Sequence, residues 1–222
     1  MAEPLLTLTG VSFAYGQTPI LKNIDLQLDP GETIGITGAN GGGKTTLFRC
    51  ITGLEKIDSG TIVFQNREIG SESDFQFLRR HLGYALQNPE DQLFFPTLLD
   101  DVCFGPLNLG FTEGEARKLA EKSLELTGLA GYAERNCFHL SGGEQRLAAL
   151  AGILAMDPKG LLLDEPLNGL DPVSTHRVST LLEKLDCAKI IISHDLEFLK
   201  KHAPVIHELK NGALAPQGNN EN

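Results

Sequence analysis

The sequence predicts an α/β fold: a mostly parallel sheet, an antiparallel β flank at the N-terminus and an inserted helical subdomain. The first observation is a glycine-rich loop at 38–45, which follows a strand-like stretch and precedes a helix-like one. Short apolar runs at 161–163 and 189–192 are typical of strands inside a parallel sheet. Helical periodicity between the glycine-rich loop and the run at 161–163 predicts one domain over 1–222, with a core at 1–87 and 157–222 and a helical subdomain at 88–156.

Length and composition indicate an ordinary soluble globular protein. The chain has 222 residues, of which 41% are hydrophobic and 22% charged. No apolar run approaches the roughly 20 residues that span a bilayer, and the N-terminus lacks a secretory signal pattern. A role at a membrane would therefore require a partner. The net charge of −10 argues against non-specific nucleic-acid binding. Four widely spaced cysteines predict free thiols in a reducing compartment.

The N-terminal part carries the expected β flank and the first core elements. Residues 5–15 alternate apolar and polar side chains, as a half-buried strand does. A second apolar set at 20–28 ends at the turn 29–32. Further along the chain we expect a helix at 45–52, ended by Gly53, and strands at 33–37, 61–64 and 82–86.

The rest of the chain predicts helices followed by core strands. Residues 113–127 have the apolar spacing of an amphipathic helix. Ser141 is a suitable N-cap for a second helix, which should end at Asp157 and Pro158. Strands are expected at 161–163, 189–192 and 205–209, and the polar tail after Asn211 is expected to fray.

The glycine-rich loop matches the P-loop pattern G-x-x-x-x-G-K-[ST] and predicts a P-loop NTPase core. Glycines allow consecutive backbone amides to turn toward phosphate oxygens, and the following helix adds its positive N-terminus. Lys44 is expected to reach the β- and γ-phosphates, and the Thr45 hydroxyl to bind Mg²⁺. The expected nucleotide-binding residues here are Gly38, Ala39, Asn40, Gly41, Gly42, Gly43, Lys44, Thr45 and Thr46.

A pair of carboxylates follows the apolar run at 161–163. Asp164 at the end of this strand could hold Mg²⁺ through water, and Glu165 could act as a general base on the attacking water. Such a base contributes roughly 10²–10⁴ in rate. The alternative, a surface turn with two acids, does not explain three leucines running into the pair.

Ser141, Gly142, Gly143 and Glu144 form a second candidate anion site at a helix start. Because the chain already has a phosphate loop, the simplest explanation is that this site faces the γ-phosphate held by another subunit. With these motifs in order, the chain resembles the ATP-binding subunits of ABC transporters. The resemblance implies a dimer in which each ATP lies between the phosphate loop of one chain and Ser141 and Gly143 of the other.

The resemblance also implies roles for four further residues. Tyr15 matches the aromatic residue that stacks on adenine, although a structural tyrosine is the alternative. Gln87 matches the glutamine that contacts Mg²⁺ and the lytic water. Asp171 matches the loop that crosses the dimer interface. His194 matches the histidine that bonds the γ-phosphate, where a structural histidine is the alternative.

Within the family, residues 87–94, 96–97, 101–102 and 104–110 resemble the cobalt/nickel importers and the energy-coupling-factor vitamin importers. The resemblance implies that this surface faces a membrane partner, so that Phe94, Phe95 and Phe104 would be exposed for docking. The alternative is that they fill the helical subdomain. One departure concerns an arginine common in the family, whose position is occupied by Leu147, with Arg146 one place earlier.

These observations together predict a cytoplasmic ATPase subunit, peripheral on the inner face of the cell membrane. ATP and Mg²⁺ are its expected cofactors. Its expected partners are a second ABC ATPase subunit, identical or a paralogue, and integral membrane transport subunits, with no nucleic acid. The expected cargo is a metal ion (cobalt or nickel), or else a vitamin. The alternatives are a soluble ABC ATPase of an assembly system, such as iron–sulfur cluster assembly, and a nucleotide-binding module without turnover.

Overall fold

The computed structural model describes residues 3–217, and its contacts group them into two compact units. The first unit contains residues 3–84, 159–164 and 187–217, and the second contains 85–158 and 165–186. The expected helical insert at 88–156 lies inside the second unit, which also includes the segment after Asp164.

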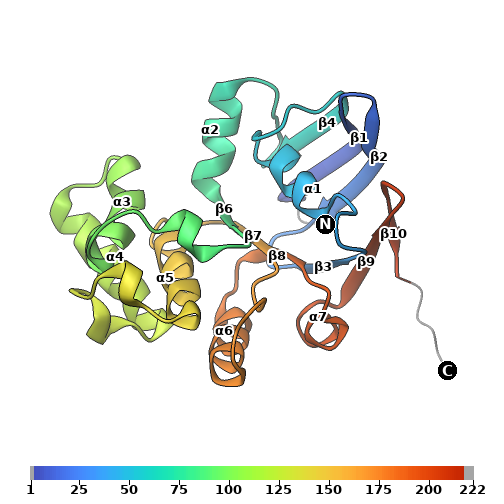
Figure 1. The fold of residues 1–222 in the computed structure, drawn as a ribbon. Helices are drawn as coiled ribbons and strands as arrows, with labels where there is room; N and C mark the ends of the chain where they lie inside the picture. The colour runs from blue at the N-terminus through green and yellow to red at the C-terminus, as the bar shows by residue number, and fades with distance from the viewer. Residues whose placement is uncertain (1–2, 218–222) are drawn as a thin grey trace. The chain divides into compact units, whose positions relative to one another are not determined.

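Two sheets provide the framework of the first unit (Figure 1). The antiparallel sheet has the order β2-β1-β4-β5, and the second sheet has the order β10-β9-β3-β8-β7-β6. Their strands are β1 (Leu6–Tyr15), β2 (Thr18–Leu28), β3 (Thr33–Thr37), β4 (Ser59–Phe64), β5 (Arg67–Glu68), β6 (Leu82–Ala85), β7 (Gly160–Asp164), β8 (Ala188–Ile192), β9 (Val205–Lys210) and β10 (Ala213–Pro216). The helices of this unit are α1 (Lys44–Ile51), α2 (Glu72–His81) and α7 (Leu196–His202).

The centre of the second sheet is parallel and buried on both faces. Strand β8 pairs in parallel with β3 on one side and with β7 on the other. Every residue of β7 and β8 is buried, which explains their unbroken apolar runs. Because the strands are parallel, their carboxyl ends meet at one edge of the sheet.

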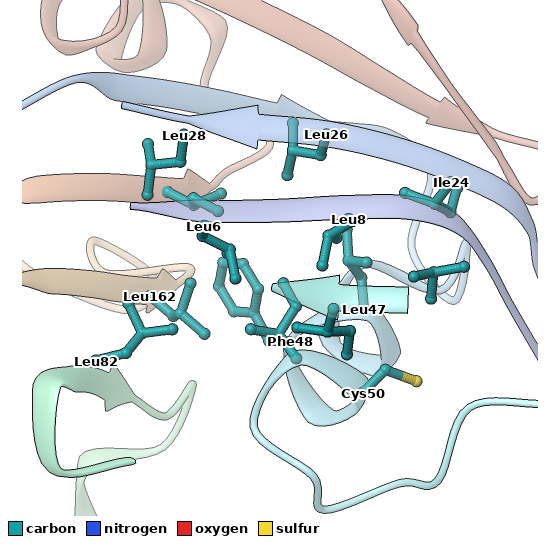
Figure 2. Packing of buried hydrophobic residues seen from close by; sticks show 14 of the residues in the cluster. Leu6, Leu8, Ile24, Leu26, Leu28, Leu47, Phe48, Cys50, Leu82 and Leu162 are labelled. Carbon is teal, nitrogen blue, oxygen red and sulfur yellow. The ribbon is translucent and has the colours of Figure 1, made fainter. Parts of the chain in front are cut away.

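Helix α1 packs among strands of both sheets. Leu47 and Phe48 of α1 are fully buried and belong to the same apolar cluster as Leu6 and Leu8 of β1 and Leu162 of β7 (Figure 2). Burying a leucine or phenylalanine side chain contributes about 1.5–3 kcal/mol. This cluster therefore holds α1, and with it the loop that precedes α1, firmly on the core.

The second unit is mostly helical. It contains α3 (Leu98–Asn108), α4 (Glu113–Thr127), α5 (Gly142–Leu154), α6 (Pro172–Lys184) and the short 3₁₀ helices η1 (Pro89–Gln92), η2 (Ala130–Tyr132) and η3 (Cys137–His139). Buried alanines and leucines pack α3, α4 and α5 together, and the Ser123 hydroxyl donates a 2.6 Å hydrogen bond to the Ala151 carbonyl. Thr112 caps α4 and Ser141 caps α5, each in a capping box with the acidic residue three positions later.

The predicted fold class is confirmed, but the prediction that the chain frays after Asn211 was wrong in part. Residues 213–216 form β10 against β9, because the Asn211–Gly212 turn, with positive φ at both residues, reverses the chain. The rest of the expected frayed tail, 218–222, lies outside the described residues. Helices α2, α6 and α7 were not anticipated. Over residues 3–217, no helix combines the length and apolar character needed to cross a membrane.

Candidate nucleotide-binding site

The phosphate loop requires glycine at several of its positions. Gly38, Gly41 and Gly43 have φ angles of 145°, 74° and 99°, a region that other residues rarely adopt. A Cβ atom on Gly38 would lie 2.4 Å from the Leu209 carbonyl oxygen. A Cβ atom on Gly43 would lie 2.8 Å from the Cγ2 atom of Ile20. Leu209 and Ile20 thus pack closely against the loop backbone and leave no room for a side chain at Gly38 or Gly43.

The start of α1 offers donors to an anion. Gly43 is the N-cap of α1 and supplies no side-chain cap, so the first amides of the helix have no side-chain acceptor there. Lys44 is 7% exposed, and its Nζ donates hydrogen bonds to the carbonyl oxygens of Gly38 (2.8 Å) and Ala39 (3.1 Å). Thr45 is exposed beside it and Thr46 is half-buried. Phosphate oxygens could replace the two carbonyls as acceptors for Lys44.

The register of the parallel strands brings three predicted elements to one edge of the first unit. Ile192 of β8 pairs with Ile36 of β3 and with Asp164 of β7, and parallel neighbours lie about 4.8 Å apart. The Ser193 amide donates to the Ile36 carbonyl oxygen, and the exposed His194 follows. The phosphate loop, Asp164 and His194 therefore lie at the same edge of the sheet.

The oxygen donors at this edge fit a magnesium ion. Asp164 is 1% exposed, and Thr45 contributes a hydroxyl at the start of α1. Mg²⁺ prefers hard oxygen ligands and is usually held by one or two carboxylates together with phosphates and water. These two residues could supply the protein's share of such a set when a nucleotide is bound.

Tyr84 was missed by the sequence interpretation. Its hydroxyl donates a 3.5 Å hydrogen bond to the carboxylate of Asp164, and its ring packs edge-on against Phe48 of α1. Burial, with the nearby Asp164 charge second, raises the pKa of Tyr84. The tyrosine therefore stays a hydrogen-bond donor and orients the carboxylate. Its position in β6, shortly before Gln87, was the only signal in the sequence.

Tyr15 ends β1 and is 47% exposed. Its ring meets Phe13 edge-on at 4.8 Å, and its hydroxyl donates to Glu55, which also pairs with Arg49 of α1. A side chain held at both ends but still half-exposed has surface left for an aromatic ligand. Stacking on adenine remains a prediction.

A cleft of about 580 Å³ opens beside the phosphate loop. Its walls come from β2, the loop and the β9–β10 hairpin, and its lining includes two lysines, Lys22 and Lys210. This volume is in the range of small-molecule sites. Tyr15 is not among the residues that line it.

The second unit carries Gln87, Glu165 and Asp171. Gln87 is exposed between β6 and η1. Glu165 is 8% exposed and has a φ of 48°, so its backbone turns sharply directly after Asp164. Asp171 caps α6, accepting from the amides of Val173 and Ser174 and, at 2.5 Å, from the Ser174 hydroxyl. The Ser174 hydrogen bonds lower the pKa of Asp171. A structural role for Asp171 is therefore visible, and its interface role stays a prediction.

The serine–glycine motif forms a capped helix start that is open to solvent. Ser141 and Gly142 are exposed, and the Ser141 hydroxyl bonds the Glu144 carboxylate at 2.8 Å. The bond from the Ser141 amide, above all, lowers the pKa of Glu144. Gly143 is buried, and a Cβ atom there would lie 2.0 Å from the Ser174 hydroxyl oxygen. The two glycines thus differ: Gly143 is needed for packing, whereas Gly142 faces open space.

We expect Gly143→Ala to destabilise the protein by about 1–3 kcal/mol, because the added methyl group overlaps Ser174. Gly142→Ala is the matched control. No atom lies within 4 Å of its Cβ position, and alanine favours a helix over glycine by up to about 1 kcal/mol. Urea unfolding of both variants measures the difference. Equal stability of the two would contradict the packing role of Gly143.

An aromatic patch, defined as Phe94, Phe95, Phe104 and Leu107, covers part of the second unit. Phe94 is 66% exposed and Phe104 is 44% exposed, which excludes the alternative that these two fill the helical core. Phe95 is half-buried against Phe104, with ring centroids 5.2 Å apart. The buried Asp101 carboxylate accepts from the amides of Phe94 (2.6 Å) and Phe95 (2.8 Å) and so orients the loop that carries them.

Comparison with known proteins supports one family. A family model described as ABC transporter matches residues 21–168. A putative ABC transporter ATP-binding protein of Nitratidesulfovibrio vulgaris is 44% identical over 96% of this chain and 78% of its own length. The energy-coupling factor transporter ATP-binding protein EcfA of Methanothermobacter thermautotrophicus is 38% identical over 96% and 70%.

Solved structures agree with the sequence relatives. The cbiO1 protein of Clostridium perfringens, described as part of the ABC transporter complex cbiONQ, has a TM-score of 0.88 and 34% identity over 98% of this chain and 89% of its own. A dimeric ATP-binding cassette in a post-hydrolysis state, bound to ADP and Pi, has a TM-score of 0.83 and 26% identity over 96% and 97%. The resemblance inferred from the motifs is confirmed.

Proposed function

Because the chain belongs to the ABC transporter family and is an ATPase of it, we propose that it powers an importer through a dimer that closes on ATP. One observation carries this proposal. The chain has a phosphate loop and, in addition, a second helix start with exposed Ser141 and Gly142. A second anion site of this kind is explained if it meets the γ-phosphate bound by another copy of the chain or a paralogue.

In this proposed dimer each residue of the site has its own role. Lys44 and the loop amides would bind phosphates, while Thr45, Asp164 and Gln87 would hold Mg²⁺, which would neutralise charge on the phosphates. Glu165 accepts a proton from the attacking water. His194 bonds the γ-phosphate, Tyr15 stacks on adenine, and Asp171 contacts the partner chain. Ser141 and Gly143 complete the site of the other chain. The dimeric cassette with ADP and Pi supports the two-chain arrangement by similarity.

The aromatic patch is the proposed contact with integral membrane subunits, which would hold the protein on the cytoplasmic face of the membrane. Exposed aromatic rings rimmed by polar residues are typical of protein interaction sites. The similarity to EcfA proteins and to cbiO1 supports an importer and favours a metal ion (cobalt or nickel) or a vitamin as cargo. Cargo selection would belong to the membrane partners.

Purification of the chain from detergent-solubilised native membranes tests this proposal. We expect multi-spanning subunits to co-purify with it, and Phe94→Glu to reduce their yield about tenfold or more, because burying an unpaired carboxylate in the contact costs several kcal/mol. Leu126→Glu is the matched control, since Leu126 is a 46% exposed apolar side chain on α4, outside the patch. Recovery of only soluble assembly proteins, unaffected by Phe94→Glu, would favour the assembly-system alternative.

A further inference from the structure

A buried arginine on α5 holds the backbone of the segment that contains Gln87. Arg146 is 1% exposed and lies five positions after Ser141 on the same helix. Its Nη1 donates to the Leu86 carbonyl oxygen at 2.6 Å, and its Nη2 donates to the Gln87 carbonyl oxygen. One guanidinium group thus bridges two successive carbonyls, about sixty positions away in the sequence.

A second side chain fixes the same segment from its other end. The Gln92 side-chain oxygen accepts from the Leu86 amide at 2.7 Å, and the Asp91 amide donates to the Asn88 carbonyl oxygen at 3.2 Å. Both backbone polar groups of Leu86 are therefore bonded within the second unit. The Gln87 side chain, in contrast, is exposed. The backbone at Gln87 is fixed, and its amide group extends from a fixed point.

Burying the charged Arg146 side chain is unfavourable in free energy, so its presence here calls for a physical explanation. Removing a guanidinium from water is strongly unfavourable unless hydrogen bonds compensate. An apolar residue at this buried position would avoid that cost. The guanidinium reaches the two carbonyls with two separate nitrogens of one rigid plane, a fixed geometry that a flexible ammonium group does not provide.

We propose that Arg146 is a positioning residue for ATP hydrolysis: it ties Gln87 to α5, the helix whose first turn carries Ser141. A displacement of α5 when Ser141 meets the nucleotide of the partner chain is then transmitted to Gln87 as a rigid movement. Each subunit thereby couples the signature contact it makes in one site to the Mg²⁺ contact it makes in the other. This inference rests on the proposed role of Gln87.

A double-mutant cycle tests the inference with the full-length dimer. The variants are Gln87→Ala, Arg146→Met and the double variant, and the measured quantities are kcat and, from equilibrium titration, the Kd of Mg²⁺ for the ATP-bound protein. We expect Arg146→Met to lower kcat and to weaken the affinity for Mg²⁺, each by about tenfold or more. Loss of a residue that orients a metal ligand typically has an effect of this size. In the Gln87→Ala background the same change should have no further effect, since residues that act as a unit are not additive.

Two further variants separate positioning from stability. Ser123→Ala removes a buried hydrogen bond between α4 and α5 in the same unit, and we expect it to lower the unfolding midpoint with kcat unchanged. Arg146→Lys should recover part of the Mg²⁺ affinity, and it replaces Arg146→Met in the cycle if that variant does not fold. A loss of kcat by the same factor in both backgrounds, or an equal loss in Ser123→Ala, would overturn the inference.

The inference and the importer function fail in different experiments. If Gln87→Ala leaves the Mg²⁺ dependence unchanged, the role of Gln87 is wrong and the inference falls with it. Co-purification with membrane subunits depends on the aromatic patch and not on Gln87 or Arg146. A negative result there would remove the importer function while the cycle still decides whether Arg146 acts through Gln87.

Discussion

Replacing Glu165 with glutamine is expected to leave ATP binding intact, to reduce turnover by about 10²-fold or more, and to trap an ATP-bound dimer. The amide cannot accept a proton from water, but it keeps the size of the carboxylate and one of its two acceptor oxygens. Glu165 is 8% exposed and follows Asp164 directly, with a φ of 48° that turns the chain at this point. Size-exclusion chromatography with ATP and a phosphate-release assay measure both effects.

Glu125→Gln is the matched control for this experiment. Glu125 is an exposed carboxylate of the same unit, on α4, so its loss should leave both turnover and dimerisation unchanged. Turnover by Glu165→Gln equal to that of the parent protein would remove Glu165 from the role of general base. A dimer trapped equally by both variants would show that the trapping is a general charge effect.

Replacing Ser141 with arginine is expected to abolish hydrolysis while each chain still binds ATP. The bulky side chain occupies the space in front of the exposed helix start, so a γ-phosphate of the partner site cannot approach it. The lost N-cap costs about 1 kcal/mol, which leaves the protein folded. Equilibrium binding of ATP to the variant, together with a phosphate-release assay, checks the expected separation of binding and turnover.

Thr112→Arg controls for the loss of the cap itself. Thr112 forms the same capping box on α4 that Ser141 forms on α5, and both residues are exposed. The two variants should therefore lose similar stability, but only Ser141→Arg should lose hydrolysis. Full activity of Ser141→Arg would refute the two-chain site. Equal inactivation of both variants would assign the effect to the helical unit and not to the signature contact.

The sequence predicted the phosphate loop well because its chemistry is local. The glycines, Lys44 and Thr45 are contiguous, and the positive φ angles at Gly38, Gly41 and Gly43 agree with the reason that glycine was expected there. Strands β7 and β8 were equally clear, since burial on both faces leaves a continuous apolar run. Helix α2 carried a weaker signal, because it is largely polar and Leu78 is its one buried residue.

The sequence by itself determined the family, the fold class and the candidate residues of a two-chain ATP site, because each motif is a short run with its own chemistry. Only the tertiary structure decided that Tyr84 orients Asp164, that Gly143 packs on Ser174 while Gly142 does not, and that Arg146 holds the backbone of Gln87. These contacts join residues 31 to 80 positions apart along the chain. Hydrogen bonds and steric contacts depend on distances in space, which no local pattern encodes.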